Sequence, residues 1–271
     1  MNALIVVWRE SLEAMLVIGV LLAWIARQPR AAPLRRALWQ GVAGGVALAG
    51  LLGAATFLAQ SQLQGETLEG FQVAMMLFAA VLIVQMVLWM RRHGRSMRDE
   101  LEQRAAQAAG GLGLTIVAAL AVAREGAETV VFLYGVGIEA GGARVTAIIG
   151  VLAGFVLAAA TAWLVARGAR FLSHRLVFRT SEILLLLVAA ALLASGIDRM
   201  IAMDWIPPML DPVWDSSALL DDRRGVGRAL ADLLGYRARP SATLLLAYLL
   251  FWLSVLAGGR VHRTAERRLP R

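Results

Sequence analysis

Long apolar stretches alternate with short arginine-rich stretches along the whole chain. Seven of the apolar stretches are predicted to be helices, at residues 3–26, 37–59, 71–90, 112–138, 145–166, 178–203 and 242–258. The first six match the roughly 20 residues that a helix needs to cross a bilayer, and the seventh is slightly shorter. Because backbone polar groups in lipid must be satisfied within the segment, such stretches form helices. The pattern therefore predicts an all-α integral membrane protein with seven transmembrane helices.

Composition agrees with a membrane protein rather than a soluble one. Hydrophobic residues make up 59% of the chain, charged residues make up 17%, and the mean hydropathy is +0.67. No shift in composition marks a boundary between domains, so residues 1–271 are expected to form a single transmembrane domain. Small residues let helices approach closely in lipid, which predicts a tightly packed bundle. Glycines recur within two predicted spans, at Gly41, Gly44, Gly45, Gly50, Gly53, Gly150 and Gly154.

The charge pattern and the absence of cysteine exclude several classes of function. The formal charge is +8, but the arginines occur in short clusters between apolar segments rather than on one basic face. This layout is typical of cytoplasmic membrane loops, so no nucleic-acid partner is expected. A chain without cysteine has no disulfide, no thiolate zinc site and no iron–sulfur cluster.

The arginine distribution predicts the orientation in the membrane. Arginine counts alternate from loop to loop, being four in 27–36, none in 60–70, five in 91–104, one in 139–144, four in 167–179 and five from residue 260 onward. Loops rich in arginine stay in the cytoplasm, which predicts an outside N-terminus and a cytoplasmic C-terminus. The loop 199–239 holds six arginines and is expected outside, because long loops cross largely regardless of charge.

Two clusters of charge interrupt the apolar segments. Arg9, Glu10 and Glu13 lie in the first predicted span, and the same Arg-Glu-x-x-Glu pattern returns in the fourth. A charge at the centre of a membrane helix costs roughly 2.5 kcal/mol or more, and such residues usually mark a pathway for an ion or a substrate. The second cluster consists of Arg124, Glu125 and Glu128. Because the same costly pattern occurs twice, we expect both clusters to have a function.

The repetition predicts two related halves. The clusters open spans one and four, so each unit holds three spans, and an odd number inverts the second unit relative to the first. Inverted repeats are common in transporters, with the binding site where the halves meet. We expect repeat one at about 1–90, repeat two at about 112–203, an outer loop at about 204–241 and a seventh helix at about 242–258.

The spacing of the glutamates predicts a metal site. Glu10 and Glu13 are three residues apart and share one helical face, as do Glu125 and Glu128. Carboxylates from two such helices suit iron, manganese, calcium or magnesium better than soft copper(I). The motif has no histidine partner, and an all-oxygen site favours a hard ion such as Fe(III). Two alternatives remain open, namely ion pairs that only hold the helices together and a proton relay through the same carboxylates.

These motifs resemble those of the oxidase-dependent iron permeases, which include the fungal high-affinity iron permease and the bacterial EfeU-type permeases. The resemblance covers essentially the whole chain and includes Trp214-Asp215-Ser216-Ser217 and the stretch from Leu234 to Ser241 in the outer loop. It implies seven transmembrane helices, an outside N-terminus and iron binding by Glu10, Glu13, Glu125 and Glu128. Arg9 and Arg124 match the motif arginines. Ser11 and Ala127 depart from the usual Arg-Glu-Gly-Leu-Glu pattern at positions that hold no metal.

The resemblance implies a permease rather than an enzyme. It would import Fe(III) across the cell membrane, the inner membrane in a bacterium, with iron as substrate and no tightly bound cofactor. The implied partners on the outer side are an oxidising ferroxidase, a cupredoxin-like protein or a haem peroxidase. Transport of Fe(II), Mn(II) or Pb(II) is the alternative. An intramembrane enzyme lacks a nucleophile–base set, and a membrane scaffold would bind no metal.

Further acidic residues are candidates for the ends of the pathway. In the outer loops these are Glu66, Glu69, Glu139, Asp211 and Asp215, with Asp221 and Asp222 beside them, and near the inner end of the sixth span it is Glu182. The outer residues would form a vestibule, and Glu182 would line the exit. The alternative is that they are ordinary solvated residues. The sequence also predicts a short amphipathic helix at 225–235 and a polar helical connection at 98–109.

Overall fold

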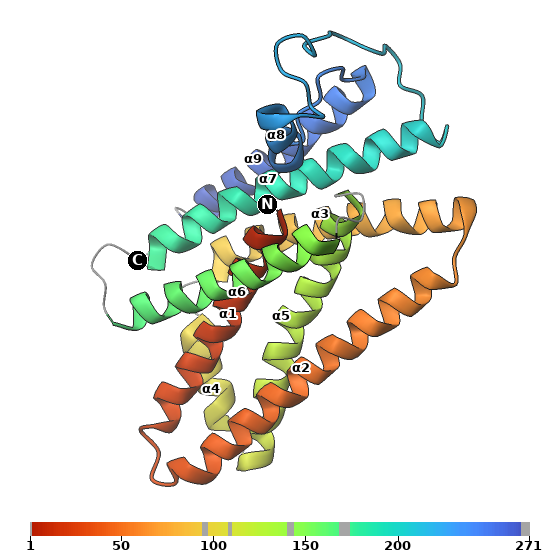
Figure 1. Cartoon of the computed structure of the whole chain (residues 1–271). Coiled ribbons are helices and arrows are strands. Elements are labelled where there is room, and N and C mark those ends of the chain that lie inside the picture. The colour runs from red at the N-terminus through yellow and green to blue at the C-terminus, as the bar shows by residue number, and fades with distance from the viewer. Residues whose placement is uncertain (1, 94–96, 108–109, 140–143, 168–173, 267–271) are drawn as a thin grey trace.

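All regular secondary structure in the described part of the chain is helical. The computed structural model describes residues 2–93, 97–107, 110–139, 144–167 and 174–266. The helices in these ranges are α1 (Asn2–Ile25), α2 (Ala31–Ser61), α3 (Gly65–His93), α4 (Met97–Gln107), α5 (Gly111–Glu139), α6 (Arg144–Ala166), α7 (His174–Ala202), α8 (Gly225–Leu234) and α9 (Ala242–Glu266) (Figure 1).

Each apolar stretch that was predicted to be a helix falls on one of the long helices. By length and composition, α2, α3, α6 and α7 qualify as membrane spans, and the apolar part of α9, Ala242–Gly258, is shorter. α1 and α5 have 24 and 29 residues, but each carries one arginine and two glutamates within five residues. The prediction of an all-helical protein with several apolar membrane helices is confirmed, and the number of seven spans stays a prediction.

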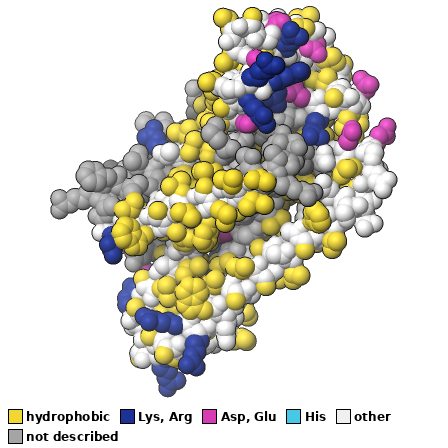
Figure 2. Space-filling view, viewed as in Figure 1, with side chains coloured by type: hydrophobic (Ala, Val, Ile, Leu, Met, Phe, Trp, Pro, Cys, Tyr) yellow, Lys and Arg dark blue, Asp and Glu magenta, His cyan; other side chains and the backbone are white. Residues whose placement is uncertain are grey.

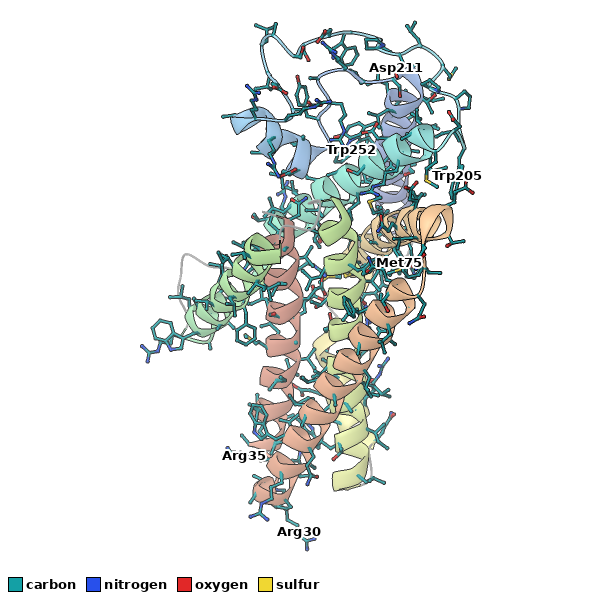
Figure 3. All side chains as sticks on the ribbon, turned by 45° about the vertical axis from the view of Figure 1, so that its right-hand side comes forward. Arg30, Arg35, Met75, Trp205, Asp211 and Trp252 are labelled. Atoms are coloured by element: carbon teal, nitrogen blue, oxygen red, sulfur yellow. The ribbon has the colours of Figure 1, made fainter. Side chains whose placement is uncertain are left out.

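Successive long helices run in alternating directions. In Figure 1, α1 descends from the N-terminus, and α2 returns toward the upper right, where the chain turns again into α3. α5 ascends beside α1, and the same opposed directions of α1 and α5 are visible in Figure 3. Figure 3 also labels Arg30, between α1 and α2, and Arg35, near the start of α2, at the lower end of the molecule, and Asp211 at the opposite end.

The helices pack in a reciprocal pattern. The most extensive contacts join α2 to α5 and α1 to α6, followed by those of α3 with α7 and of α1 with α5. The first long helix of each predicted repeat therefore packs against the second long helix of the other. The two clusters of charge consequently lie on neighbouring helices, although they are separated by 115 positions in the sequence.

Glycines make the closest of these contacts. A Cβ atom on Gly45 of α2 would lie 2.7 Å from the carbonyl oxygen of Ala119 in α5. On the other pair, a Cβ atom on Gly154 of α6 would lie 2.7 Å from the carbonyl oxygen of Leu4 in α1. These neighbours are backbone atoms, which cannot turn aside as a flexible side chain can. The glycines expected to support close packing lie at these two interfaces, except Gly50, where a Cβ atom would meet nothing within 4 Å.

Replacing Gly154 by alanine is expected to destabilise the fold by about 1–3 kcal/mol, the usual cost of overpacking. The added methyl group would also lie 3.0 Å from the amide nitrogen of Trp8, so α6 must move away from α1. The matched control is Gly50→Ala in α2, where the new methyl group meets nothing within 4 Å. Thermal unfolding in detergent measures both, and equal midpoints for Gly154→Ala and the wild type would contradict this packing.

The two short helices occupy the polar connections where the sequence predicted them. α4 packs against α1 and α5, with Ala105 buried and Glu102 paired with Arg27 at 2.9 Å. α8 packs against α7 and ends at Gly235, which has a φ of +71°. A Cβ atom at Gly235 would also lie 3.0 Å from the Cβ atom of Ala194 in α7, so both conformation and space require glycine there.

The segment between α7 and α9 is held together by the two stretches that carry the resemblance. Val213 donates its backbone N–H to Pro240 at 2.9 Å, and Ser216 donates to Ala238 at 2.9 Å. Arg237 attaches the segment to α7, because its guanidinium contacts Asp198 and donates to Ser195 Oγ at 2.9 Å. The segment is thus a folded cap on one end of the bundle, and Figure 3 shows Trp205 and Asp211 within it.

The surface is apolar around its middle. Figure 2 shows hydrophobic side chains over the central part of the visible face, arginines at the lower left and charges of both signs toward the top. Large apolar side chains of α2 and α6 are exposed, among them Leu51, Phe57, Ile149 and Phe155. Such a belt between charged ends is the surface expected of a protein that sits in a bilayer.

Candidate metal site

Three of the four motif glutamates converge between α1 and α5. One oxygen each from Glu10, Glu13 and Glu125 can be chosen so that all three lie within 4.8 Å of one another. All three residues are buried, with exposed fractions of 1%, 6% and 8% respectively. The spacing of three residues places Glu10 and Glu13 on one face of α1, and the opposed packing of α5 brings Glu125 to that face.

Arg9 is the buried member of the arginine pair. Its residue is only 1% exposed. Nη1 lies 2.7 Å from Glu10 Oε1, and Nη2 forms an ion pair with Glu13 Oε1. The guanidinium therefore lies against both carboxylates of its own motif, as an ion pair in a low-dielectric interior requires.

Arg124 and Glu128 lie at the more open side of the site. Arg124 Nε donates to Glu128 Oε1 at 3.0 Å and lies 3.8 Å from Glu125 Oε1. The Arg124 side chain is 48% exposed, that of Glu128 is 17% exposed, and the guanidinium lies 4.9 Å from the centre of the Trp89 ring. The two motifs share one sequence pattern, but their arginines have different surroundings.

Two methionines of α3 complete the surroundings of Arg9. Met86 Sδ accepts from Arg9 Nη1, and Met90 Sδ accepts from Arg9 Nη2. Both methionines are buried, and their spacing of four residues places them on one face of α3. Sequence analysis did not identify either one, and it also missed Trp89. The only available signal was this spacing, which is equally usual for methionines in an ordinary apolar core.

Several carboxylate oxygens at the site remain without hydrogen bonds. Among the described residues, Glu10 Oε2, Glu125 Oε2 and Glu128 Oε2 are buried and have no hydrogen-bond partner. A buried, unsatisfied charged group costs several kcal/mol of stability, on the order of 1–3 or more. The cluster also holds four carboxylates against two guanidinium groups. An added cation would satisfy both the free oxygens and the surplus of negative charge.

The donor set fits a hard or borderline cation. Carboxylate oxygens from two helices would be its ligands, and the two arginines would offset the charge when no cation is bound. The structure thus brings together Glu10, Glu13 and Glu125 with Arg9, and places Arg124 and Glu128 beside them.

Glu182 belongs to α7 and lies beside the C-terminal end of α3. Its Oε2 accepts a hydrogen bond from Arg91 Nε at 3.0 Å, which links α7 to the end of α3. Arg91 directly follows Met90, so this pair lies next to the methionines that contact Arg9. Glu182 is therefore an ion-paired residue at the end of α3 rather than a free surface acid.

The acidic residues predicted to form an outer vestibule lie on different elements of the fold. Glu66 and Glu69 are exposed near the start of α3, and Asp211 is exposed in the cap that follows α7. The side chain of Glu139, the last residue of α5, lies outside the described part of the structure. None of the described outer acids belongs to the group of three converging carboxylates.

Asp215 has partners of its own within the cap. Ser217 donates to Asp215 Oδ1 from its hydroxyl at 2.6 Å and from its backbone N–H at 2.9 Å, and Arg239 lies 2.9 Å from Oδ2. These hydrogen bonds from Ser217, followed by that from Arg239, lower the pKa of Asp215 to about 2. Asp222 likewise accepts from the backbone N–H of Ala238 at 3.1 Å. These contacts favour a structural role for both aspartates.

A separate cavity of about 310 Å³ lies where the cap meets α9. Its lining includes Trp214, Leu234, Tyr236, Leu244 and Tyr248, and it contains no carboxylate. Its lining thus differs from the carboxylate cluster between α1 and α5.

Comparison with known proteins places this arrangement in a family. The model of the iron permease FTR1 family matches residues 1–261. The chain is 27% identical to the ferrous iron permease EfeU of Yersinia pestis, over 93% of the chain and 90% of that protein. It is 26% identical to the ferrous iron permease EfeU of Escherichia coli O6:H1, over 98% of both proteins.

A more similar relative carries no functional name. An uncharacterized protein of Archaeoglobus fulgidus is 30% identical over 98% of the chain and 96% of its own length. No solved structure is significantly similar to the chain.

Proposed function

The chain belongs to the iron permease FTR1 family, and we propose that it carries iron across the membrane through the buried carboxylates of α1 and α5. Membership of a permease family, together with the apolar helices, makes it a multi-pass membrane protein for iron transport rather than an enzyme. The observation that supports the site most strongly is the convergence of Glu10, Glu13 and Glu125, buried and within 4.8 Å.

The two motifs would act as one site at the centre of an inverted repeat. Support comes from the opposed directions of α1 and α5 and from the reciprocal packing of α1 on α6 and of α2 on α5. In this proposal, the N-terminus and the cap face outward, and the end of the molecule that holds Arg30 and Arg35 faces the cytoplasm. In a bacterium the membrane would be the inner one.

The ion would enter from the cap side and leave near Glu182. Glu66, Glu69 and Asp211 are exposed on the outer side and would attract cations before they reach the buried site. Beyond the site, Arg91 and Glu182 lie next to Met90. Their ion pair would separate when the ion leaves, because a cation competes with Arg91 for the same carboxylate.

Charge balance favours Fe(II) as the ion that crosses. Four carboxylates and two guanidinium groups leave a surplus of two negative charges, which a divalent cation neutralises. The names of the Yersinia and Escherichia relatives point the same way. The sequence-based preference for Fe(III) rests on the all-oxygen motif, and it remains the alternative. An outer oxidising partner would be needed only for that alternative.

Uptake into proteoliposomes that contain an iron-sensitive dye tests the proposal. We expect Fe(II), kept reduced by ascorbate, to enter faster than Fe(III) citrate, and we expect Mn(II) and Pb(II) in equal concentration to inhibit only partially. Protein-free liposomes are the control. Iron entry no faster than in this control, for both oxidation states, would refute iron transport, whereas faster entry of Fe(III) would refute only the choice of ion.

A further inference from the structure

We propose that Met86 and Met90 of α3 are metal ligands and that, with Glu10 and Glu13, they form a cation position that Arg9 occupies in this structure. The inference rests on the proposed function, because it concerns the path of the same ion. It adds a sulfur-containing position to a site that the motifs alone describe as purely oxygen.

The guanidinium of Arg9 marks where this position lies. Nη1 contacts Glu10 Oε1 and Met86 Sδ, and Nη2 contacts Glu13 Oε1 and Met90 Sδ. Two oxygens and two sulfurs from two helices thus surround one buried cation. When the guanidinium turns away, the same four atoms face the place that it leaves.

Stabilising Arg9 does not by itself account for the thioethers. A methionine sulfur is a weak hydrogen-bond acceptor, whereas guanidinium in a protein interior is usually paired with carboxylate or carbonyl oxygens. Here each Nη atom contacts one carboxylate oxygen and, in addition, one thioether sulfur where a second oxygen would be usual. Arg9 Nε is buried without a hydrogen-bond partner in the described structure, so the arginine is held only through its two Nη atoms.

Free oxygens lie directly beside this position. Glu10 Oε2 is buried and unpaired, and Glu125, whose Oε2 is also unpaired, belongs to the same group of converging carboxylates. An ion held by Glu10, Glu13 and Glu125 would therefore lie close to the thioether sulfurs of Met86 and Met90. Repulsion between this ion and the guanidinium would drive Arg9 out of its place, and the movement would break only the Nη contacts, which are its side-chain hydrogen bonds in the described part of the chain.

The sulfur ligands define the class of ion. Thioethers bind soft and borderline cations and contribute little to the binding of hard trivalent ones. A position made of two carboxylates and two thioethers would hold Fe(II) and discriminate against Fe(III), Ca(II) and Mg(II). The spacing of Met86 and Met90 allows both sulfurs to reach one ion from one face of α3.

X-ray absorption at the iron K edge tests the assignment directly. The full-length protein in detergent would be loaded anaerobically with one equivalent of Fe(II), for the wild type, the double variant Met86→Leu/Met90→Leu, and the control Met76→Leu. Leucine conserves the volume of methionine, so the fold is retained. Met76 is fully buried in the same helix and lies roughly 15 Å from Met86 along the axis.

We expect sulfur in the iron coordination of the wild type and of Met76→Leu, and its loss in the double variant. Fe(II) affinity should fall about tenfold or more in the double variant, since losing even a group that only supports a ligand costs 10–100-fold. Iron bound by oxygen alone in the wild type would overturn the inference and leave the proposed function standing. A protein that binds no iron at all would overturn both.

Discussion

Replacing Glu10 or Glu125 by glutamine is expected to reduce iron uptake by about 100-fold or more, because each change removes a metal ligand and one negative charge. Changes to groups that merely support a ligand cost 10–100-fold in affinity, so the loss of a ligand should cost at least as much. Both residues are buried, and each has an oxygen without a hydrogen-bond partner among the described residues, which leaves it free to bind an ion.

The two variants should still fold. Glutamine has nearly the same shape as glutamate, and the site holds four carboxylates against two arginines, so removing one charge lessens the repulsion between the remaining ones. The control is Asp99→Asn, which changes an exposed acid in the first turn of α4, outside the proposed path. Uptake into proteoliposomes and thermal unfolding would be measured together. Folded Glu10→Gln and Glu125→Gln variants with the uptake rate of Asp99→Asn would show that iron takes another route.

Replacing Arg9 by glutamine is expected to cost about 3–5 kcal/mol of stability, the usual effect of removing one partner from a buried ion pair. Arg9 is 1% exposed and pairs with both Glu10 and Glu13, so its loss leaves two buried carboxylates without their nearest positive charge. The matched variant is Arg124→Gln at the same position of the second motif. Its side chain is 48% exposed, so the cost there should be smaller.

Chemical and thermal unfolding of both arginine variants in the same detergent measures this difference. The structure predicts a clearly lower midpoint for Arg9→Gln than for Arg124→Gln. In the structure the two arginines have different surroundings, because only Arg9 contacts Met86 and Met90. Equal midpoints for the two variants would contradict this difference.

The sequence was sufficient to predict the helices and the principal carboxylates. Apolar stretches of the right length can satisfy their backbone groups only as helices, so spans such as 145–166 were found within a residue or two. The pairing of Glu10 with Glu13 follows from helical geometry. The repeated motif predicts that Glu125 joins them. Charged clusters are costly in lipid and usually functional, so two of them in related helices are expected to form one site.

The different surroundings of Arg9 and Arg124 could not be predicted from the sequence. Arg9 and Arg124 occupy the same position in the same pattern, and what distinguishes them is α3, which supplies Met86 and Met90 to one and Trp89 to the other. Which face of α3 meets which motif depends on the packing of the whole bundle. A methionine in an apolar helix is most often an ordinary core residue.

The role of Asp215 in the cap could not be predicted from its residue type and position alone. Asp215 was a candidate for an ion vestibule because it is acidic and was expected on the outer side. In the structure it accepts hydrogen bonds from Ser217 and pairs with Arg239, which joins the two stretches that form the cap. These partners lie 2 and 24 positions away, and only the nearer one could have been suspected from the sequence.

The location of bound iron tests the central claim most directly. A structure of the iron-loaded protein, with anomalous scattering recorded at the iron absorption edge, would place the ion without reference to its ligands. We predict a peak between α1 and α5, within coordination distance of Glu10, Glu13 and Glu125. An iron peak away from all four motif glutamates would contradict the assignment of this site.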